Sequence, residues 1–178
     1  MDPNQAQENN NASPQGYTPK YLIKPRVEGL GGWLVFVQIS LYFSLISIMY
    51  VLVTILFPVF EPETWNLITD KTSPGYNQAL IQLIIFETVF NVIFVITAVI
   101  ALFILYRKKK AFPKLMIGYI SFSLLVSIVD YAAVSQIEIM AHGDNGKFMS
   151  EWIRSLLYAS IWIPYFIRSK RVRNTFVN

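Results

Sequence analysis

The chain has 178 residues, of which 54% are hydrophobic and only 15% are charged, and its mean hydropathy is +0.43. A soluble domain carries about 25% charged residues, so this composition argues for a membrane protein rather than a water-soluble globular core. The sequence contains no cysteine and a single histidine, His142. Disulfides, cysteine nucleophiles and zinc sites that need two histidines are therefore excluded.

The chain begins with a polar segment, residues 1–20, which is rich in Asn, Gln, Pro and Ser. This composition predicts a disordered cytoplasmic tail. The segment lacks the basic region and the adjoining apolar stretch of a signal peptide, so we expect the first membrane span to act as an uncleaved targeting signal. Residues 21–178 are predicted to form one transmembrane domain.

Four apolar segments follow the tail, and a spanning helix needs about 20 predominantly apolar residues. The predicted spans are residues 33–58, 80–106, 114–138 and 150–167. The first carries no charge, and the fourth is the shortest. We predict an all-α integral membrane bundle of four transmembrane helices. The alternative, a soluble bundle of unusually apolar helices, is disfavoured by uncharged runs of this length.

The basic residues predict how the bundle is oriented, because short cytoplasmic loops carry an excess of Lys and Arg. Three segments hold 12 of the 15 basic residues: the one before the first span, the loop after the second, and the C-terminal tail. Both termini are therefore predicted to be cytoplasmic, at the inner membrane of a bacterium. We define the basic anchor, expected to contact anionic lipids, as Arg107, Lys108, Lys109, Lys110, Arg168, Lys170, Arg171 and Arg173. The net charge of +4 then needs no nucleic-acid partner.

Three ionisable residues fall within predicted spans: Glu87, Asp130 and Arg154. Each costs about 2.5–3.5 kcal/mol at mid-bilayer on insertion scales, so such residues usually face the bundle interior. The helical rise places all three in the outer half of the bilayer, with Asp130 and Arg154 nearly level. We predict that Arg154 bridges Asp130 and that Glu87 lies close by or reaches outward.

Polar side chains at helical spacing are predicted to support this charge cluster. They are Asn91 on the second span, Ser123 and Ser127 on the third, and Tyr158 on the fourth. The favoured interpretation is structural, because small and hydroxyl residues let helices pack closely and a paired charge fixes their register. The other interpretation is a hydrated path in which Glu87 or Asp130 exchanges a proton.

Several short motifs resemble a known family. Gly31-Gly32-Trp33-Leu34 opens the first span, and Lys109-Lys110-Ala111-Phe112-Pro113 opens the third. Near the C-terminus, Ile161-Trp162-Ile163-Pro164-Tyr165-Phe166 precedes Ser169-Lys170-Arg171-Val172 and Thr175-Phe176. In this order they resemble the bacterial membrane family called domain of unknown function 2569. The resemblance implies a small multi-span inner-membrane protein and transfers no activity and no catalytic residue.

The sequence as a whole favours a non-catalytic membrane protein that acts as an accessory or sensing subunit through helix–helix contacts. We expect the bilayer and either a membrane protein or a second copy of the chain as partners, with no cofactor, metal or nucleic acid. The alternative is a small proton- or ion-coupled carrier built around Glu87, Asp130 and Arg154. A third and less favoured hypothesis is an enzyme that acts on lipid headgroups.

Overall fold

The computed structural model of the chain describes residues 28–134 and 145–178. The predicted disordered tail, residues 1–20, lies outside these residues. Every regular element in the described part is helical, as the apolar runs predict. In chain order the elements are α1 (Trp33–Val51), η1 (Leu52–Leu56), α2 (Phe57–Val59), α3 (Pro62–Thr69), α4 (Gln78–Tyr106), α5 (Ala111–Val134), α7 (Asn145–Arg168) and α8 (Lys170–Thr175).

Three helices are long and apolar enough to cross a membrane: Trp33–Val59, which combines α1, η1 and α2, then Gln78–Tyr106 and Ala111–Val134. At 1.5 Å per residue they measure about 36–44 Å, more than the roughly 30 Å of a hydrocarbon core. They correspond to the predicted spans 33–58, 80–106 and 114–138; residues 135–138 of the third lie outside the described part. In the described residues every regular element is helical, as predicted, and three of the helices are long and apolar enough to cross a membrane.

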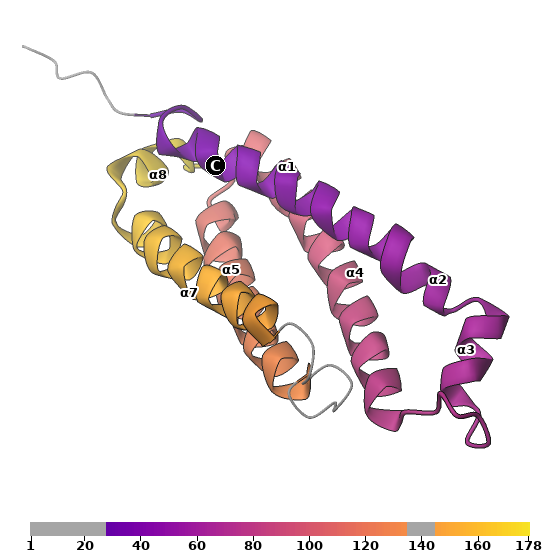
Figure 1. Cartoon of the computed structure of the whole chain (residues 1–178). Helices are drawn as coiled ribbons and strands as arrows, with labels where there is room; N and C mark the ends of the chain where they lie inside the picture. The colour runs from indigo at the N-terminus through magenta and orange to yellow at the C-terminus, as the bar shows by residue number, and fades with distance from the viewer. Residues whose placement is uncertain (1–27, 135–144) are drawn as a thin grey trace, which may run out of the picture.

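The fourth predicted span, residues 150–167, lies within α7, which runs antiparallel beside α5 (Figure 1). This helix has 24 residues and is long enough to cross. It is more polar than the other three, and Arg154 interrupts its apolar run, so it is not among the helices that qualify by composition. The predicted helix is confirmed, and its composition alone does not establish a fourth crossing.

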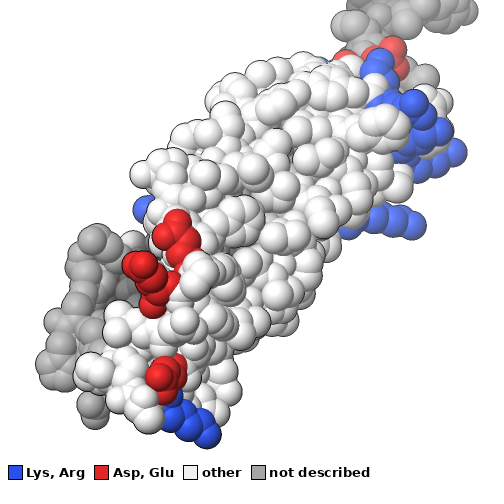
Figure 2. All heavy atoms as spheres, turned by 90° about the vertical axis from the view of Figure 1, so that its right-hand side faces the viewer, with Lys and Arg blue, Asp and Glu red and all other residues white. Residues whose placement is uncertain are grey.

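The surfaces of the long helices are apolar and largely uncovered. Only 17–22% of the residues in the apolar stretch of each candidate span are buried. On α1, Phe43 is 71% exposed and Ile46 is 67% exposed. Figure 2 shows a broad uncharged surface between the charged ends of the molecule. A monomeric soluble protein rarely exposes so large an apolar patch, whereas a membrane protein covers such a surface with lipid tails.

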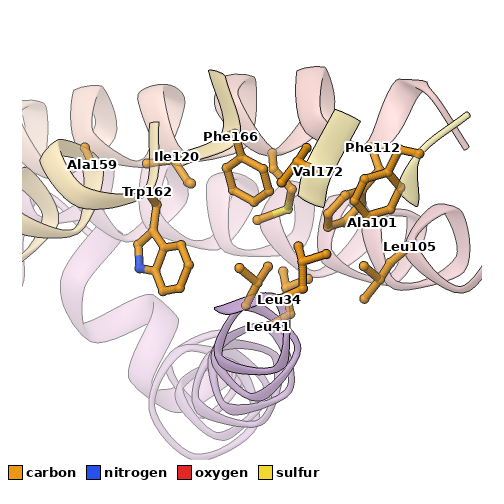
Figure 3. Close-up of a cluster of buried hydrophobic side chains, with 13 residues drawn as sticks. Leu34, Leu41, Ala101, Leu105, Phe112, Ile120, Ala159, Trp162, Phe166 and Val172 are labelled. Atoms are coloured by element: carbon orange, nitrogen blue, oxygen red, sulfur yellow. The ribbon is translucent and has the colours of Figure 1, made fainter. Parts of the chain in front are cut away.

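The core lies at the end of the bundle where the described chain both begins and ends (Figures 1 and 3). Its buried side chains come from α1, α4, α5, α7 and α8. Phe112 at the start of α5 is fully buried, stacks on Phe176 with ring centroids 4.7 Å apart, and meets the edge of Phe166 at 5.9 Å. This aromatic cluster holds the C-terminal segment against α5 and α7.

Backbone hydrogen bonds tie three separate segments together at this end, which we call the terminal clasp (residues 28–32, 107–110 and 169–178). The Gly29 amide donates to the Thr175 hydroxyl at 2.8 Å. The Lys110 amide donates to the carbonyl of Asn178 at 2.7 Å, and the Asn178 amide donates to the Lys108 carbonyl. The structure therefore places two of the three basic segments, the loop after α4 and the C-terminal segment, at one end; the basic residues before the first span lie outside the described residues.

The first span contains a π-helical turn, η1, which the sequence did not predict. The Phe57 amide donates to the carbonyl of Leu52, five residues back, and the hydroxyl of Thr54 donates to the Tyr50 carbonyl at 2.7 Å. Pro58 follows and has no amide hydrogen to donate, which disfavours a regular α-helical ladder here. Such single turns occur mostly as local widenings of α-helices, frequently at functional sites.

Candidate functional site: two cavities between the helices

The half of the bundle away from the terminal clasp contains a cavity of about 710 Å³, which we call the carboxylate cavity. Its wall is mostly aliphatic and aromatic and comes from α1, η1, α2, α3, α4 and α5. The lining residues are Val51, Ile55, Leu56, Val59, Thr64, Ile68, Leu80, Leu83, Ile84, Glu87, Phe90, Asn91, Phe94, Val126, Asp130 and Val134. The π-helical turn thus contributes directly to the wall.

Both carboxylates of the predicted charge cluster border this cavity, Glu87 from α4 and Asp130 from α5. Asn91 lies one helical turn from Glu87, and its side-chain amide donates to the Glu87 carbonyl at 2.8 Å. The side chains of Glu87, Asn91 and Asp130 are partly buried. The structure therefore brings together two members of the predicted charge cluster and one of the supporting polar residues.

A second cavity of about 370 Å³ lies beside the first, and we call it the tyrosine cavity. Two hydrogen bonds between helices cross it: Ser40 on α1 pairs with Tyr158 on α7 at 2.9 Å, and Ser44 on α1 pairs with Tyr119 on α5 at 3.3 Å. Its lining is Ser40, Leu41, Phe43, Ser44, Ile48, Asn91, Phe94, Tyr119, Ser123, Arg154, Ser155 and Tyr158.

Arg154 lines the tyrosine cavity and not the carboxylate cavity. The structure therefore places Arg154 beside a different cavity from Glu87 and Asp130, and the bridge between Arg154 and Asp130 stays a prediction. Asn91 and Phe94 line both cavities and lie where the two adjoin. The helical rise predicts the height of each charge along its helix, but it carries no information on which way a side chain faces.

Of the predicted polar residues Ser123 and Ser127, only Ser123 lines a cavity. Ser123 lines the tyrosine cavity, and its hydroxyl donates to the Ile120 carbonyl of its own helix at 2.9 Å. Ser127 donates to the Leu124 carbonyl in the same way and lines neither cavity. Tyr119 was left out of the predicted site, but it makes the same kind of hydrogen bond to α1 as Tyr158 does. The signal that could have identified it is its spacing of four residues from Ser123, which puts both side chains on one face of the helix.

The basic anchor residues gather at the clasp end of the molecule, where Figure 2 shows most of the visible Lys and Arg; most of the visible Asp and Glu lie toward the opposite end, next to a smaller group of basic atoms. Lys108, Lys109 and Lys110 form the turn between α4 and α5, and Arg168 ends α7. Lys170, Arg171 and Arg173 belong to α8. The guanidinium of Arg107 lies 4.2 Å from the ring centroid of Phe103, a cation–π contact at the end of α4.

One residue of the basic anchor also has a structural role. The guanidinium of Arg171 packs against Gly31 and Gly32, where a Cβ atom would meet it at 3.3 Å, and it donates to the Glu28 carbonyl at 3.4 Å. Gly32 has φ +61° and ψ −136°, a conformation that residues with a side chain rarely adopt. The close approach of Arg171 therefore depends on glycine.

The motifs that carry the family resemblance meet in the terminal clasp. Gly31 and Gly32 contact Arg171, Thr175 binds the backbone of Gly29, and Phe112 stacks on Phe176. These motifs therefore specify the packing of one end of the bundle, and the residues that line the carboxylate cavity lie outside them.

Comparison with known proteins gives one match. The family described as "Protein of unknown function (DUF2569)" matches residues 27–177. No curated protein and no solved structure matches the chain. The matched region includes both cavities, all four long helices and the clasp except Asn178, and it confirms the resemblance drawn from the sequence motifs. The chain belongs to the DUF2569 family.

Proposed function

We propose that the protein is a non-catalytic, multi-pass protein of the bacterial inner membrane that acts as an accessory or sensing subunit through contacts between its helices and another membrane protein. The observation that carries the proposal is the difference between the two halves of the bundle. At the clasp the helices close around a core, whereas in the other half the polar faces of α4 and α5 border a cavity of about 710 Å³. Polar groups at membrane depth need a neighbour other than lipid, and a partner's helix supplies one.

The proposal includes four crossings. The first three follow from the composition of their helices, and support for the fourth comes from packing: α7 runs antiparallel beside α5, has the same number of residues, and ends at the clasp where α5 begins. Membrane thickness constrains both helices alike. The basic residues at the clasp favour a cytoplasmic location for this end and for both termini.

Side-chain hydrogen bonding in the tyrosine cavity supports a non-catalytic role. Four of the hydroxyls that line it join helices, in the pairs Ser40–Tyr158 and Ser44–Tyr119. Hydrogen bonds of this kind stabilise helix association within a membrane by about 0.6 kcal/mol on average. We therefore assign these groups to holding α1 against α5 and α7.

Photocross-linking combined with gentle extraction tests the proposal. A photoreactive residue at Ile55, which is exposed and lines the carboxylate cavity, should give a cross-link to one membrane protein that also co-purifies in stoichiometric amount. The matched control is Ile167, which is 61% exposed near the clasp and should give no such cross-link. A chain that is extracted alone, or only with copies of itself, would overturn the accessory role.

The second candidate function is a proton- or ion-coupled carrier, and one observation favours it. Glu87 and Asp130 share a cavity, and the polar tyrosine cavity adjoins it at Asn91 and Phe94, so polar groups continue along the interior of the bundle. The carrier function predicts that purified protein in liposomes conducts protons and that Glu87→Gln with Asp130→Asn abolishes the flux while the protein remains folded. Undiminished flux in that folded variant would reject it.

A further inference from the structure

The carboxylate cavity has the size and lining of a ligand site. Small-molecule sites have volumes of about 300–1,000 Å³, are mostly apolar and carry a few convergent polar groups. This cavity measures about 710 Å³ and combines an aliphatic and aromatic wall with Glu87, Asp130, Asn91 and Thr64. We propose that it binds a lipophilic organic cation, a single positive charge surrounded by hydrocarbon or aromatic groups.

The charge of the proposed ligand follows from the lining residues. Among the lining residues that the structure describes, two are acidic and none is basic. Arg154 lines the neighbouring cavity instead. At membrane depth the attraction between opposite charges is strengthened by the low dielectric constant, so a cation is favoured here and an anion is opposed.

The aromatic residues of the wall also suit a cation with an apolar body. Phe90 and Phe94 both line the cavity, and both pack on Phe122 of α5, at 5.5 and 5.7 Å between ring centroids. The rings are thereby held in place, and an organic cation gains from contact with aromatic faces. A rigid aromatic wall also lowers the entropic cost of binding.

A metal ion fits the cavity less well than an organic cation. Calcium takes six to eight oxygen ligands and magnesium demands a nearly octahedral set. The side chains of this wall offer oxygen from four residues, Thr64, Glu87, Asn91 and Asp130, and they are spread over α3, α4 and α5. The other twelve lining residues are apolar, and their burial against a ligand contributes only if the ligand is itself apolar.

This inference goes beyond the proposed function, because such a site serves an accessory or sensing subunit and a carrier equally. In a sensing subunit the cation would be the signal, and in a carrier it would be the cargo. The test therefore uses the purified full chain and does not depend on any partner.

Two ions of nearly the same shape and opposite charge provide the test. Radiolabelled tetraphenylphosphonium should bind the full chain in nanodiscs saturably, with one ion per protein, above the partition into empty nanodiscs. Tetraphenylborate should show only the unsaturable partition into lipid. Saturable binding of both ions with similar affinity would overturn the proposal, because it would show an apolar site that ignores charge.

Matched variants assign the binding to the cavity. Glu87→Gln combined with Asp130→Asn should weaken tetraphenylphosphonium binding about tenfold or more. Glu61→Gln removes one negative charge at an exposed site outside the cavity and should leave the affinity unchanged. If the double variant elutes as a single folded species and still binds normally, the proposal fails.

A steric variant covers the case in which the carboxamide pair does not fold. Ile84→Trp places a larger side chain on the cavity wall without changing its charge, and it should abolish saturable binding. Unchanged binding in this variant would overturn the proposal. Absence of binding in the native chain would also overturn it and would leave the accessory function to be judged on co-purification.

Discussion

The substitution Gly32→Ala tests the account of the terminal clasp. Gly32 precedes α1 with φ +61° and ψ −136°, and the guanidinium of Arg171 lies where a Cβ would project, with Cζ and Nε each at 3.3 Å. An L-residue in this region of backbone space costs about 1–3 kcal/mol. The contact adds to this cost, because the neighbouring atoms are planar and held by the hydrogen bond to the Glu28 carbonyl.

The same substitution at another glycine should raise the stability of the protein rather than lower it. Gly118 lies inside α5, where a new Cβ meets nothing within 4 Å. Alanine there should stabilise the helix by about 1 kcal/mol, the difference in helix propensity between the two residues. The structure therefore predicts a difference of about 2–4 kcal/mol between Gly32→Ala and Gly118→Ala.

Unfolding by sodium dodecyl sulfate in mixed micelles measures this difference. Trp33 follows Gly32 and lies 6.3 Å from Trp162 between ring centroids, so tryptophan fluorescence reports on the clasp. Adding Arg171→Ala to Gly32→Ala should recover the part of the unfolding free energy that is lost through the clash with the guanidinium. The part lost through the strained backbone conformation at residue 32 should remain. If Gly32→Ala is as stable as Gly118→Ala, the assigned conformation of Gly32 is wrong.

Three further predictions follow from the described contacts. Phe112→Ala should lower the free energy of unfolding by about 3–5 kcal/mol in the same titration, because the ring is fully buried and stacked. A double-mutant cycle of Ser40→Ala and Tyr158→Phe should give a coupling energy of about 0.5–1.5 kcal/mol for their hydrogen bond. The pKa of Asp70 is lowered by hydrogen bonds from the Thr72 amide and then from its hydroxyl. Its contribution to stability is therefore present above the unfolded pKa and is lost as the pH falls through the folded value, and Thr72→Val should raise that pKa toward 3.8 in a carbon-13 NMR titration.

Each of these predictions has a matched control. Phe43→Ala removes a ring that is 71% exposed, and a loss as large as that of Phe112→Ala would contradict the position of the core. Additive effects of Ser40→Ala and Tyr158→Phe would show that the two hydroxyls do not interact. An unchanged Asp70 pKa in Thr72→Val would remove the hydroxyl as a cause of the shift.

The long helices were predictable from sequence, because a segment in lipid must satisfy its own backbone and be apolar over the full thickness of the bilayer. The predicted span 80–106 agrees within two residues with α4, Gln78–Tyr106, whereas α5 and α7 begin three and five residues before the predicted spans 114–138 and 150–167. The π-helical turn was not predictable, since the apolar run through Leu52–Leu56 has the same composition with or without it.

The candidate site was predicted in part. Height along a helix follows from residue number, and Glu87 and Asp130 line the same cavity. Direction around the axis depends on how the helices pack, which the sequence does not give, and Arg154 lines the neighbouring cavity instead. Arg171 and Gly32 are far apart in the sequence but in contact in the structure. The glycines indicated that another group packs closely against the backbone before the first span, but the sequence did not show that this group is Arg171.

The central claim is that four helices cross the membrane, with the terminal clasp on the cytoplasmic side. The chain has no cysteine, so single cysteines serve as unique labels for an impermeant maleimide. Ser73→Cys between α3 and α4 and Asn145→Cys at the start of α7 should react in intact spheroplasts, and Lys109→Cys in the clasp should react only after permeabilisation. Reaction of Asn145→Cys from the same side as Lys109→Cys would contradict the account, because α7 would then not cross.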